Sequence, residues 1–447
     1  MKPIQSEAVN TIRALSVDAI EKANSGHPGL PLGGAPMTYA LFADHLKFNP
    51  EKPEWIDRDR FVMSAGHGSA LLYSLLHLFG YGVSLSDIKN FRQWGSRTPG
   101  HPEFKHTPGV ETTTGPLGQG IANAVGMAIA EKIMSNKFNQ KAHALIDHYT
   151  YCFTGDGCLM EGISAEASAV AGYLKLGKLI MLYDSNDISL DGPTTLTFTE
   201  DIKKRYESYG WHVQTVKKGD TDLNAIGNAI DKAKKETEKP SLIIVKTTIG
   251  YGSPNKGGTE KSHGAPLGEK ETELTKQFLG MDPNKKFYVS KKAKAHFDKI
   301  IEEKKTAFEG WGKLRKSYEK KYPELYKELL AFEGLRIVGS IEKMLPEFKA
   351  GEKLATRVSN HNVMTALGQK IEWLVSLDAD LSCSTKAFLK GAGYFDAIVQ
   401  NGRNVRMGVR EHAMAAIANG ISCHGGLRPT TGTFFSFVDY MRPSVRL

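Results

Sequence analysis

Short apolar runs alternate with longer segments of helical period through the first half of the chain. The runs lie at residues 60–64, 149–153, 179–183, 211–216 and 242–247. Such alternation is typical of parallel sheets, because two parallel strands need a crossover of a dozen or more residues, usually a helix. The pattern predicts an α/β fold in which doubly wound parallel sheets are flanked by helices.

Residues 149–186 form the clearest β-α-β pattern of the chain. The first apolar run breaks at Gly155-Asp156-Gly157, an alanine-rich segment of helical period follows, and the second run ends just before Asn186. Because such crossovers are right-handed and loops gather at the carboxyl ends of strands, we expect Asp156 and Asn186 on one sheet edge.

This sheet edge is a candidate diphosphate site. A diphosphate would bind at the helix N-terminus, but the carboxylate of Asp156 would repel it unless a divalent cation lay between them. The spacing therefore predicts a metal-bridged diphosphate. The alternative is an ordinary β-α-β unit whose aspartate only caps a helix.

Three histidines stand on successive loops at expected sheet edges. His27 lies in the segment NSGHPG, His67 at a strand-to-helix turn, and His101 in the Pro/Gly-rich loop PGHPE. Alone, His27 is equally consistent with a loop histidine bonded to a backbone carbonyl. Three such residues together indicate a cleft.

Two further glycine-containing segments flank helices and strands. Residues 112–120 (TTTGPLGQG) lead into an alanine-rich helix at 121–134, and IGYG at 249–252 is followed by Ser262-His263-Gly264. Glycines permit close backbone approach, and a helix start offers unpaired N–H donors. By itself the first segment is also consistent with a helix packed through small residues.

The second half of the chain begins with Lys/Glu-rich helices over residues 269–352, which we interpret as an interdomain connection. A further domain is expected from 353 to 447, with strands near 373–377 and 405–409. Its segment REHAM places Glu411 at a helix start, where a glutamate often only complements the helix dipole.

Composition narrows the class of protein. The chain has 447 residues, 40% of them hydrophobic and 24% charged, which suits two or three soluble domains. No apolar run is long enough for a bilayer span, and the first residues lack a signal peptide's apolar core. The net charge of +9 comes from lysines mixed with glutamates, so we expect neither nucleic-acid nor membrane binding. Four separated cysteines without a CxxC pair indicate reduced thiols and a cytoplasmic protein.

Several of these segments together resemble the transketolase family of thiamine diphosphate-dependent enzymes. They are NSGHPG, GPLGQG, GDGCLMEGISAEA with its following Asn, SHGAP, REHAM and GTFFSF. The resemblance implies the thiamine diphosphate-binding fold, with a diphosphate-binding domain at 1–268 and a pyrimidine-binding domain at 353–447. We expect the latter to be incomplete and the family's C-terminal domain to be absent.

The resemblance implies roles for individual residues. Mg²⁺ or Ca²⁺ is expected on Asp156, Asn186 and the backbone carbonyl of Ile188. Thiamine diphosphate is expected to contact His67, Gly115, Pro116, Leu117, Gly157, Asn186, His263, Asp380 and Phe437. The expected catalytic residues are His27, His101, His263 and Glu411, of which Glu411 would bond the aminopyrimidine. The substrate is expected to contact His27, His263, Arg357 and Ser384.

The implied activity is transketolase: a thiamine diphosphate carbanion carries a two-carbon ketol unit from a ketose phosphate to an aldose phosphate, in the pentose phosphate pathway. The implied assembly is a homodimer with active sites at the subunit interface. Alternatives are a formaldehyde transketolase, a 1-deoxyxylulose-5-phosphate synthase, or a non-catalytic transketolase-like binding protein. One departure is the segment VSLDADLSCST, which replaces the family's GGSADLTPSN.

Overall fold

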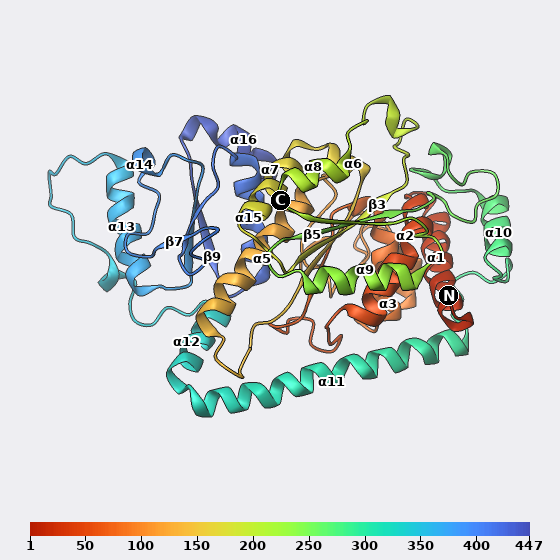
Figure 1. Cartoon of the computed structure of the whole chain (residues 1–447), viewed down its shortest axis with the longest axis horizontal. Helices are drawn as coiled ribbons and strands as arrows, with labels where there is room; N and C mark the ends of the chain where they lie inside the picture. The colour runs from red at the N-terminus through yellow and green to blue at the C-terminus, as the bar shows by residue number, and fades with distance from the viewer. The chain divides into compact units, whose positions relative to one another are not determined.

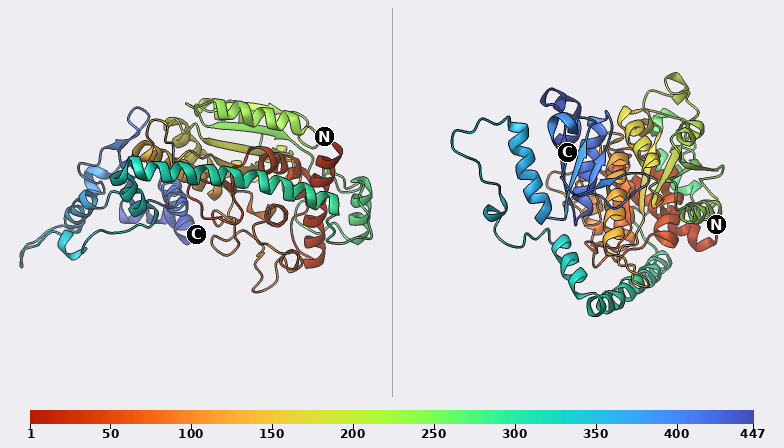
Figure 2. Two further views of the ribbon diagram at one scale, coloured as in Figure 1. Left: turned by 90° about the horizontal axis from the view of Figure 1, so that it is seen from below. Right: turned by 60° about the vertical axis from the view of Figure 1, so that its left-hand side comes forward.

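The computed structural model describes residues 1–447, which form two compact units. Unit 1 contains Met1–Ile121, Tyr149–Gly162 and Gly177–Glu309, and unit 2 contains Ala122–His148, Ile163–Leu176 and Gly310–Leu447. Figures 1 and 2 show a twisted sheet with helices in each unit. The expected boundaries near residues 268 and 353 stay predictions. None of the helices combines the length and apolarity that a membrane span requires.

Unit 1 is built on a five-stranded parallel sheet of order β1-β2-β3-β5-β4. Its strands are β1 (Arg60–Met63), β2 (Thr150–Gly155), β3 (Leu179–Ser185), β4 (His212–Val216) and β5 (Ser241–Lys246). All five predicted strands are confirmed. β3 is buried along its whole length and β2 along all but its last residue, which explains their continuous apolar runs.

The helices of unit 1 cover the sheet. They are α1 (Pro3–Ala23), α2 (Gly29–Ala40), α3 (Ser69–Leu78), α4 (Leu85–Lys89), α6 (Asp156–Met160), α8 (Ile202–Ser208), α9 (Leu223–Lys235) and α10 (Glu269–Phe278). α9 contacts β4 and β5, while α2 contacts β3 and packs on α1. α1 ends where Asn24 takes a left-handed conformation, with φ 47°, a common helix stop.

The helix α2 was not predicted from its sequence, GLPLGGAPMTYA. Glycine and proline have the lowest helix propensities, so the local pattern gives no helix signal. Every residue of α2 is buried, and the helix continues into a π-helical turn, η1 (Leu41–His45). Tertiary packing therefore outweighs local propensity here.

Unit 2 is built on a four-stranded parallel sheet of order β7-β8-β6-β9. Its strands are β6 (Leu374–Asp378), β7 (Tyr394–Phe395), β8 (Asn404–Arg406) and β9 (Arg428–Gly432). The predicted strands near 373–377 and 405–409 correspond to β6 and β8. β9, with the sequence RPTTG, was missed because it contains proline and glycine, which an edge strand tolerates.

Helices complete unit 2. They are most of α5 (Gln119–Phe138), α7 (Gly162–Tyr173), α12 (Pro323–Glu333), α13 (Thr356–Lys370), α14 (Ser382–Thr385), α15 (Glu411–His424) and α16 (Val438–Arg446). The 31-residue helix α11 (Lys291–Lys321) runs along the chain from unit 1 into unit 2. The predicted Lys/Glu-rich helices over residues 269–352 are α10, α11 and α12.

Two glycines allow α5 and α15 to touch backbone to backbone. A Cβ on Gly420 would collide with the carbonyl oxygen of Asn123, and one on Gly126 with that of Ile417. The side chain of Asn123 also donates a hydrogen bond of 2.8 Å to the carbonyl of Ala416. The two helices therefore pack at a distance that no larger residue permits.

We predict that Gly420→Ala lowers the free energy of unfolding by about 1–3 kcal/mol, because the new methyl group must push the helices apart. Chemical denaturation of the variant measures this loss. Gly310→Ala on α11 is the control, since no atom lies within 4 Å of its added Cβ and alanine favours a helix. Equal midpoints for the two variants would contradict the close packing of α5 on α15.

Candidate active site

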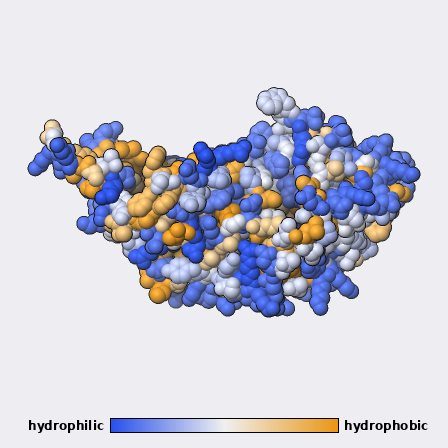
Figure 3. Space-filling view, turned by 90° about the horizontal axis from the view of Figure 1, so that it is seen from above, coloured by the Kyte–Doolittle hydropathy of each residue, from blue (hydrophilic) through white to orange (hydrophobic).

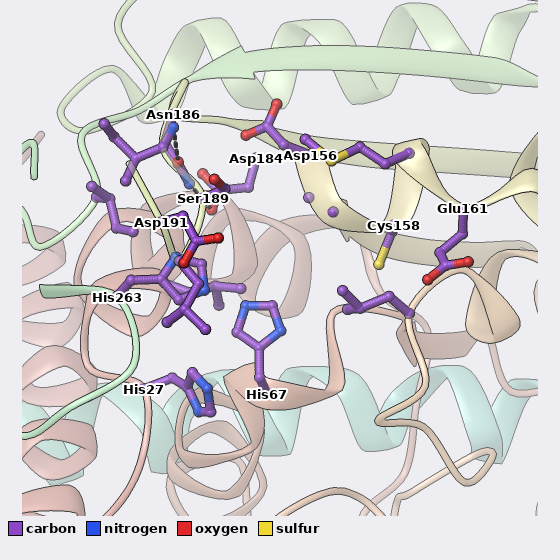
Figure 4. A pocket seen from close by; sticks show the side chains of 18 of the residues that line it. His27, His67, Asp156, Cys158, Glu161, Asp184, Asn186, Ser189, Asp191 and His263 are labelled. Carbon is purple, nitrogen blue, oxygen red and sulfur yellow. Dashed lines mark hydrogen bonds between the residues drawn. The ribbon is translucent and has the colours of Figure 1, made fainter. Parts of the chain in front are cut away.

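A pocket of about 500 Å³ lies in unit 1 at the carboxyl ends of β2 and β3 (Figure 4). Most of the predicted site residues of unit 1 line it together: His27, His67, His101, Gly115, Leu117, Asp156, Gly157, Asn186, Ile188 and His263. Pro116 does not line the pocket. Residues from seven separated segments thus meet at the sheet edge that the strand pattern predicted.

Asp156 and Asn186 reach this pocket because β2 and β3 pair in parallel, with Gly155 opposite Asp184. Asp156 opens α6 and is 5% exposed. Tyr183 donates a hydrogen bond to its Oδ1, while its Oδ2 is buried without a partner. Asn186 accepts a hydrogen bond of 3.1 Å from the backbone N–H of Ile188.

Two buried carboxyl groups make this end of the pocket favourable for a cation. Burial is the main cause that raises the pKa of Asp156 to about 6 and that of Asp184 to about 7. Asn186 donates a hydrogen bond of 3.0 Å to Asp184, and Thr247 donates another. A divalent cation would relieve both the raised pKa values and the unpartnered oxygen of Asp156.

The donor set itself fits a hard cation. No group of three His, Cys, Asp or Glu side chains is arranged to hold a metal ion, so a site made of such side chains alone is absent. The predicted set instead combines one carboxylate, one amide and one backbone carbonyl, all oxygen donors suited to Mg²⁺ or Ca²⁺. The residues present fit the ion that the sequence predicts.

Asp184 was missed in the sequence, although a signal was present. It precedes Asn186 by two positions at the end of an apolar run, and residues i and i+2 of a strand share a face. Cys158 and Asp191 also line the pocket and were not predicted. Nothing in the local pattern distinguishes Cys158 from an ordinary core residue.

Four histidines surround one side of the pocket. The ring of His27 lies 5.1 Å from that of His67, 6.5 Å from that of His101 and 6.0 Å from that of His263, between centroids. Figure 4 shows His27, His67 and His263 at the same wall. The Nδ1 atoms of His27 and His263 are buried without a hydrogen-bond partner.

These imidazoles are neutral at physiological pH. Burial, assisted by the charges of His263, Arg92 and His101, lowers the pKa of His27 to about 4. Burial also lowers the pKa of His67 well below its usual value and that of His263 below its usual value. A neutral imidazole both donates and accepts a hydrogen bond, which suits the recognition of hydroxyl and carbonyl groups.

Glycines set the width of the pocket where loops approach one another. Gly115 has φ +146°, and a Cβ there would lie 3.2 Å from Cγ of His101. A Cβ on Gly157 would lie 2.9 Å from a methyl carbon of Leu117. Larger residues at either position would fill part of the pocket or displace its lining.

The remaining predicted residues belong to unit 2. Glu411 is the first residue of α15, is 7% exposed, and accepts a hydrogen bond of 3.0 Å from the hydroxyl of Thr433. The ring of Phe437 lies 5.9 Å from that of Phe434, and both side chains are partly exposed. The interpretation of Glu411 as only a dipole-complementing residue does not explain its burial.

The other three residues of unit 2 are more exposed. Asp380 is exposed and adopts a left-handed conformation with φ +67°, and Arg357 is exposed in the first turn of α13. Ser384 lies in the short helix α14. The nearby Asp378, which the sequence did not single out, is buried with its Oδ2 unpartnered, and burial raises its pKa.

Fold and site together define an α/β protein with a polar pocket at the carboxyl ends of its parallel strands. Residues 4–334 match the family model described as transketolase, thiamine diphosphate binding domain, and residues 352–447 match transketolase, pyrimidine binding domain. The chain belongs to the transketolase family, whose members are thiamine diphosphate-dependent transferases. The predicted family and the thiamine diphosphate-binding fold are confirmed.

The sequence similarity to known transketolases extends over the whole chain. It is 51% identical to the transketolase of Bacillus subtilis, over 100% of this chain and 67% of that protein, and 51% identical to that of Geobacillus stearothermophilus, over 99% and 66%. Transketolase from Leishmania mexicana superposes with a TM-score of 0.97 at 45% identity, over 100% of this chain and 66% of that one. A Pichia stipitis transketolase complex with sedoheptulose-7-phosphate gives 0.97 at 45%, over 99% and 66%. The chain spans about two thirds of the length of these relatives.

The neutral state of His67 predicts how stability depends on pH. Because the folded pKa is depressed, the unfolded chain binds more protons below about pH 6.5, so stability falls as the pH falls. His67→Gln removes this contribution. The unfolding free energy of the parent minus that of the variant should fall by about 1 kcal/mol between pH 6.5 and pH 5.5, with a slope that approaches about 1.4 kcal/mol per pH unit at lower pH.

Chemical denaturation at pH 6.5, 6.0 and 5.5 measures this difference. His106→Gln, at an exposed loop histidine, is the matched control. Parallel curves for the parent and His67→Gln would mean that His67 gains its proton as readily in the folded protein as in the unfolded one.

Proposed function

We propose that this chain acts as a transketolase, transferring a two-carbon ketol unit from a ketose phosphate to an aldose phosphate. The observation that carries this proposal is the pocket of unit 1, which joins the oxygen donors of Asp156 and Asn186 to a wall of neutral histidines.

The residues of unit 1 divide into two sets. Asp156, Asn186 and the carbonyl of Ile188 would hold Mg²⁺ or Ca²⁺, and with it the diphosphate of the cofactor near Gly157. His27, His101 and His263 would orient the hydroxyls and carbonyl of the sugar. His67 and His263 would also contact the diphosphate.

We assign the remaining roles to residues of unit 2. Ketol transfer requires a carbon nucleophile, which thiamine diphosphate supplies when bound. Glu411, held by Thr433, would share a proton with the aminopyrimidine N1′, and Phe437 would pack against that ring. Arg357 and Ser384 would bind a substrate phosphate, for which a guanidinium offers a bidentate fit.

We further propose a homodimer with active sites at the subunit interface, in the cytoplasm and in the pentose phosphate pathway. Unit 2 carries large exposed apolar side chains, which mark interaction surfaces. They include Val409, Phe435, Val438, Tyr440 and Val445. Figure 3 shows apolar patches within a mostly polar surface. A mass of two chains by light scattering tests the dimer, and a mass of one chain would contradict it.

We predict that Asp156→Asn weakens binding of thiamine diphosphate with Mg²⁺ by more than ~100-fold, because a charged ligand of the cation becomes neutral. Isothermal titration calorimetry measures the loss. Asp201→Asn is the control, since this exposed aspartate caps α8 and asparagine caps equally well. Unchanged affinity in Asp156→Asn would refute the metal site.

Glu411→Gln tests the cofactor-activating role. We expect kcat/KM for ketol transfer to fall by roughly 10²–10⁴-fold in the full-length protein, because glutamine cannot exchange a proton with the aminopyrimidine. A coupled assay with a ketose phosphate and an aldose phosphate measures the rate. Glu347→Gln, at an exposed position of unit 2, is the control. Equal rates in both variants would overturn the assignment of Glu411.

A further inference from the structure

Arg92 lies beside the histidine wall without lining the pocket. It adopts a left-handed backbone conformation with φ +62°, which is unfavourable for a non-glycine residue. Residues held in such conformations cluster at functional sites. No role for Arg92 follows from the pocket lining or from the predicted site.

The side chain of Arg92 reaches two loops at once. Its Nη1 donates a hydrogen bond of 3.1 Å to the hydroxyl of Ser25, two residues before His27. Its guanidinium also lies against Gly100, next to His101, so closely that an added Cβ there would be 3.4 Å from Cζ and Nε. The backbone N–H of Arg92 donates to the carbonyl of Thr98 at 3.0 Å.

The loop that carries His101 is also held from its other side. Ser69 donates a hydrogen bond of 2.7 Å to the carbonyl of Gly100, and Tyr73 donates one of 2.9 Å to that of Pro99. These contacts fix the loop against α3. Arg92 connects it to the loop of His27.

The guanidinium is incompletely paired. Its Nε and Nη2 atoms are buried without a hydrogen-bond partner, and no carboxylate forms an ion pair with it. Burial lowers the pKa of Arg92, but a guanidinium remains charged at physiological pH. The positive charge of Arg92 is therefore not neutralised by an ion pair.

We propose that Arg92 is a positioning residue of the site: its guanidinium joins the loops of His27 and His101 and places a positive charge beside both imidazoles. The link fixes the separation of the two histidines. The charge opposes their protonation, so that both accept hydrogen bonds from sugar hydroxyls. This functional part rests on the proposed ketol transfer.

The electrostatic surroundings agree with this role. The groups facing His27 are Arg92 and the imidazoles of His67, His101 and His263, and all but His67 add to the effect of burial in lowering its pKa. For His101 the pKa is lowered by burial and then by Arg92. His101 is more exposed than His27, so solvent screens the charge more strongly there. The carboxyl groups of the pocket lining are Asp156, Glu161, Asp184 and Asp191.

The test compares three variants in the full chain by NMR titration of ¹³C-labelled histidines, with signals assigned through His27→Gln and His101→Gln. Arg92→Met should raise the pKa of both histidines, and more for His27. Arg92→Lys keeps the charge and should keep both values low. Arg97→Met removes an equal charge from an exposed position five residues along and should change neither.

Kinetics supply the second measurement. In the full-length holoenzyme, Arg92→Met should lower kcat/KM by roughly 10- to 100-fold, because His27 and His101 are displaced. The acid limb of the pH profile of kcat/KM should also move to higher pH, because the pKa values of the two histidines rise. Ser25→Ala, which breaks the link but keeps the charge, should raise KM without moving that limb. It also keeps the inference testable if Arg92→Met does not fold.

Unchanged histidine pKa values in Arg92→Met, or an equal rise in Arg97→Met, would overturn the inference. A movement of the acid limb in Ser25→Ala would also overturn it, because the charge would then not be the cause. The titrations need no turnover. If the protein shows no ketol transfer, the proposed function is refuted. If the low histidine pKa values still depend on Arg92 in that protein, the electrostatic role of Arg92 stands.

Discussion

The parallel pairing of β2 with β3 is the constraint on which the site of unit 1 depends. It sets Gly155 opposite Asp184 and so brings the loop of Asp156 beside that of Asn186. Nearly all residues of both strands are buried, which fixes the register, because a slip of one residue would turn every side chain to the other face. The proposed metal and diphosphate site depends on this register.

The pocket keeps polar groups in an environment that is unfavourable for them. Asp156 and Asp184 have raised pKa values, the histidine pKa values are depressed, and several polar atoms lack partners. Each feature reduces the stability of the empty protein. Each is also relieved by a bound cation, a diphosphate or a polyhydroxylated substrate. The site is therefore prepared for its ligands at the expense of stability.

The sequence alone predicted those elements whose formation depends mainly on residues near one another in the chain. The five strands of unit 1 and the helices α1, α3, α5 and α9 follow from apolar runs and helical period. α2 and β9 were missed, because glycine and proline dominate their sequences and only burial against neighbouring elements stabilises them. β7 has only two residues and gives no pattern at all. The expected domain boundaries stay predictions.

By itself the sequence determined the class of fold, the placing of Asp156 and Asn186 on one sheet edge, and the three histidine-bearing loops. The positions of strands and loops along the chain follow from local patterns, and the shared sheet edge follows from the handedness of crossovers. Only the tertiary structure decided that the histidines are neutral, that Asp184 is buried beside Asn186, and that Arg92 connects two of the loops. Burial and through-space charge depend on segments far apart in the chain, so no local pattern can record them.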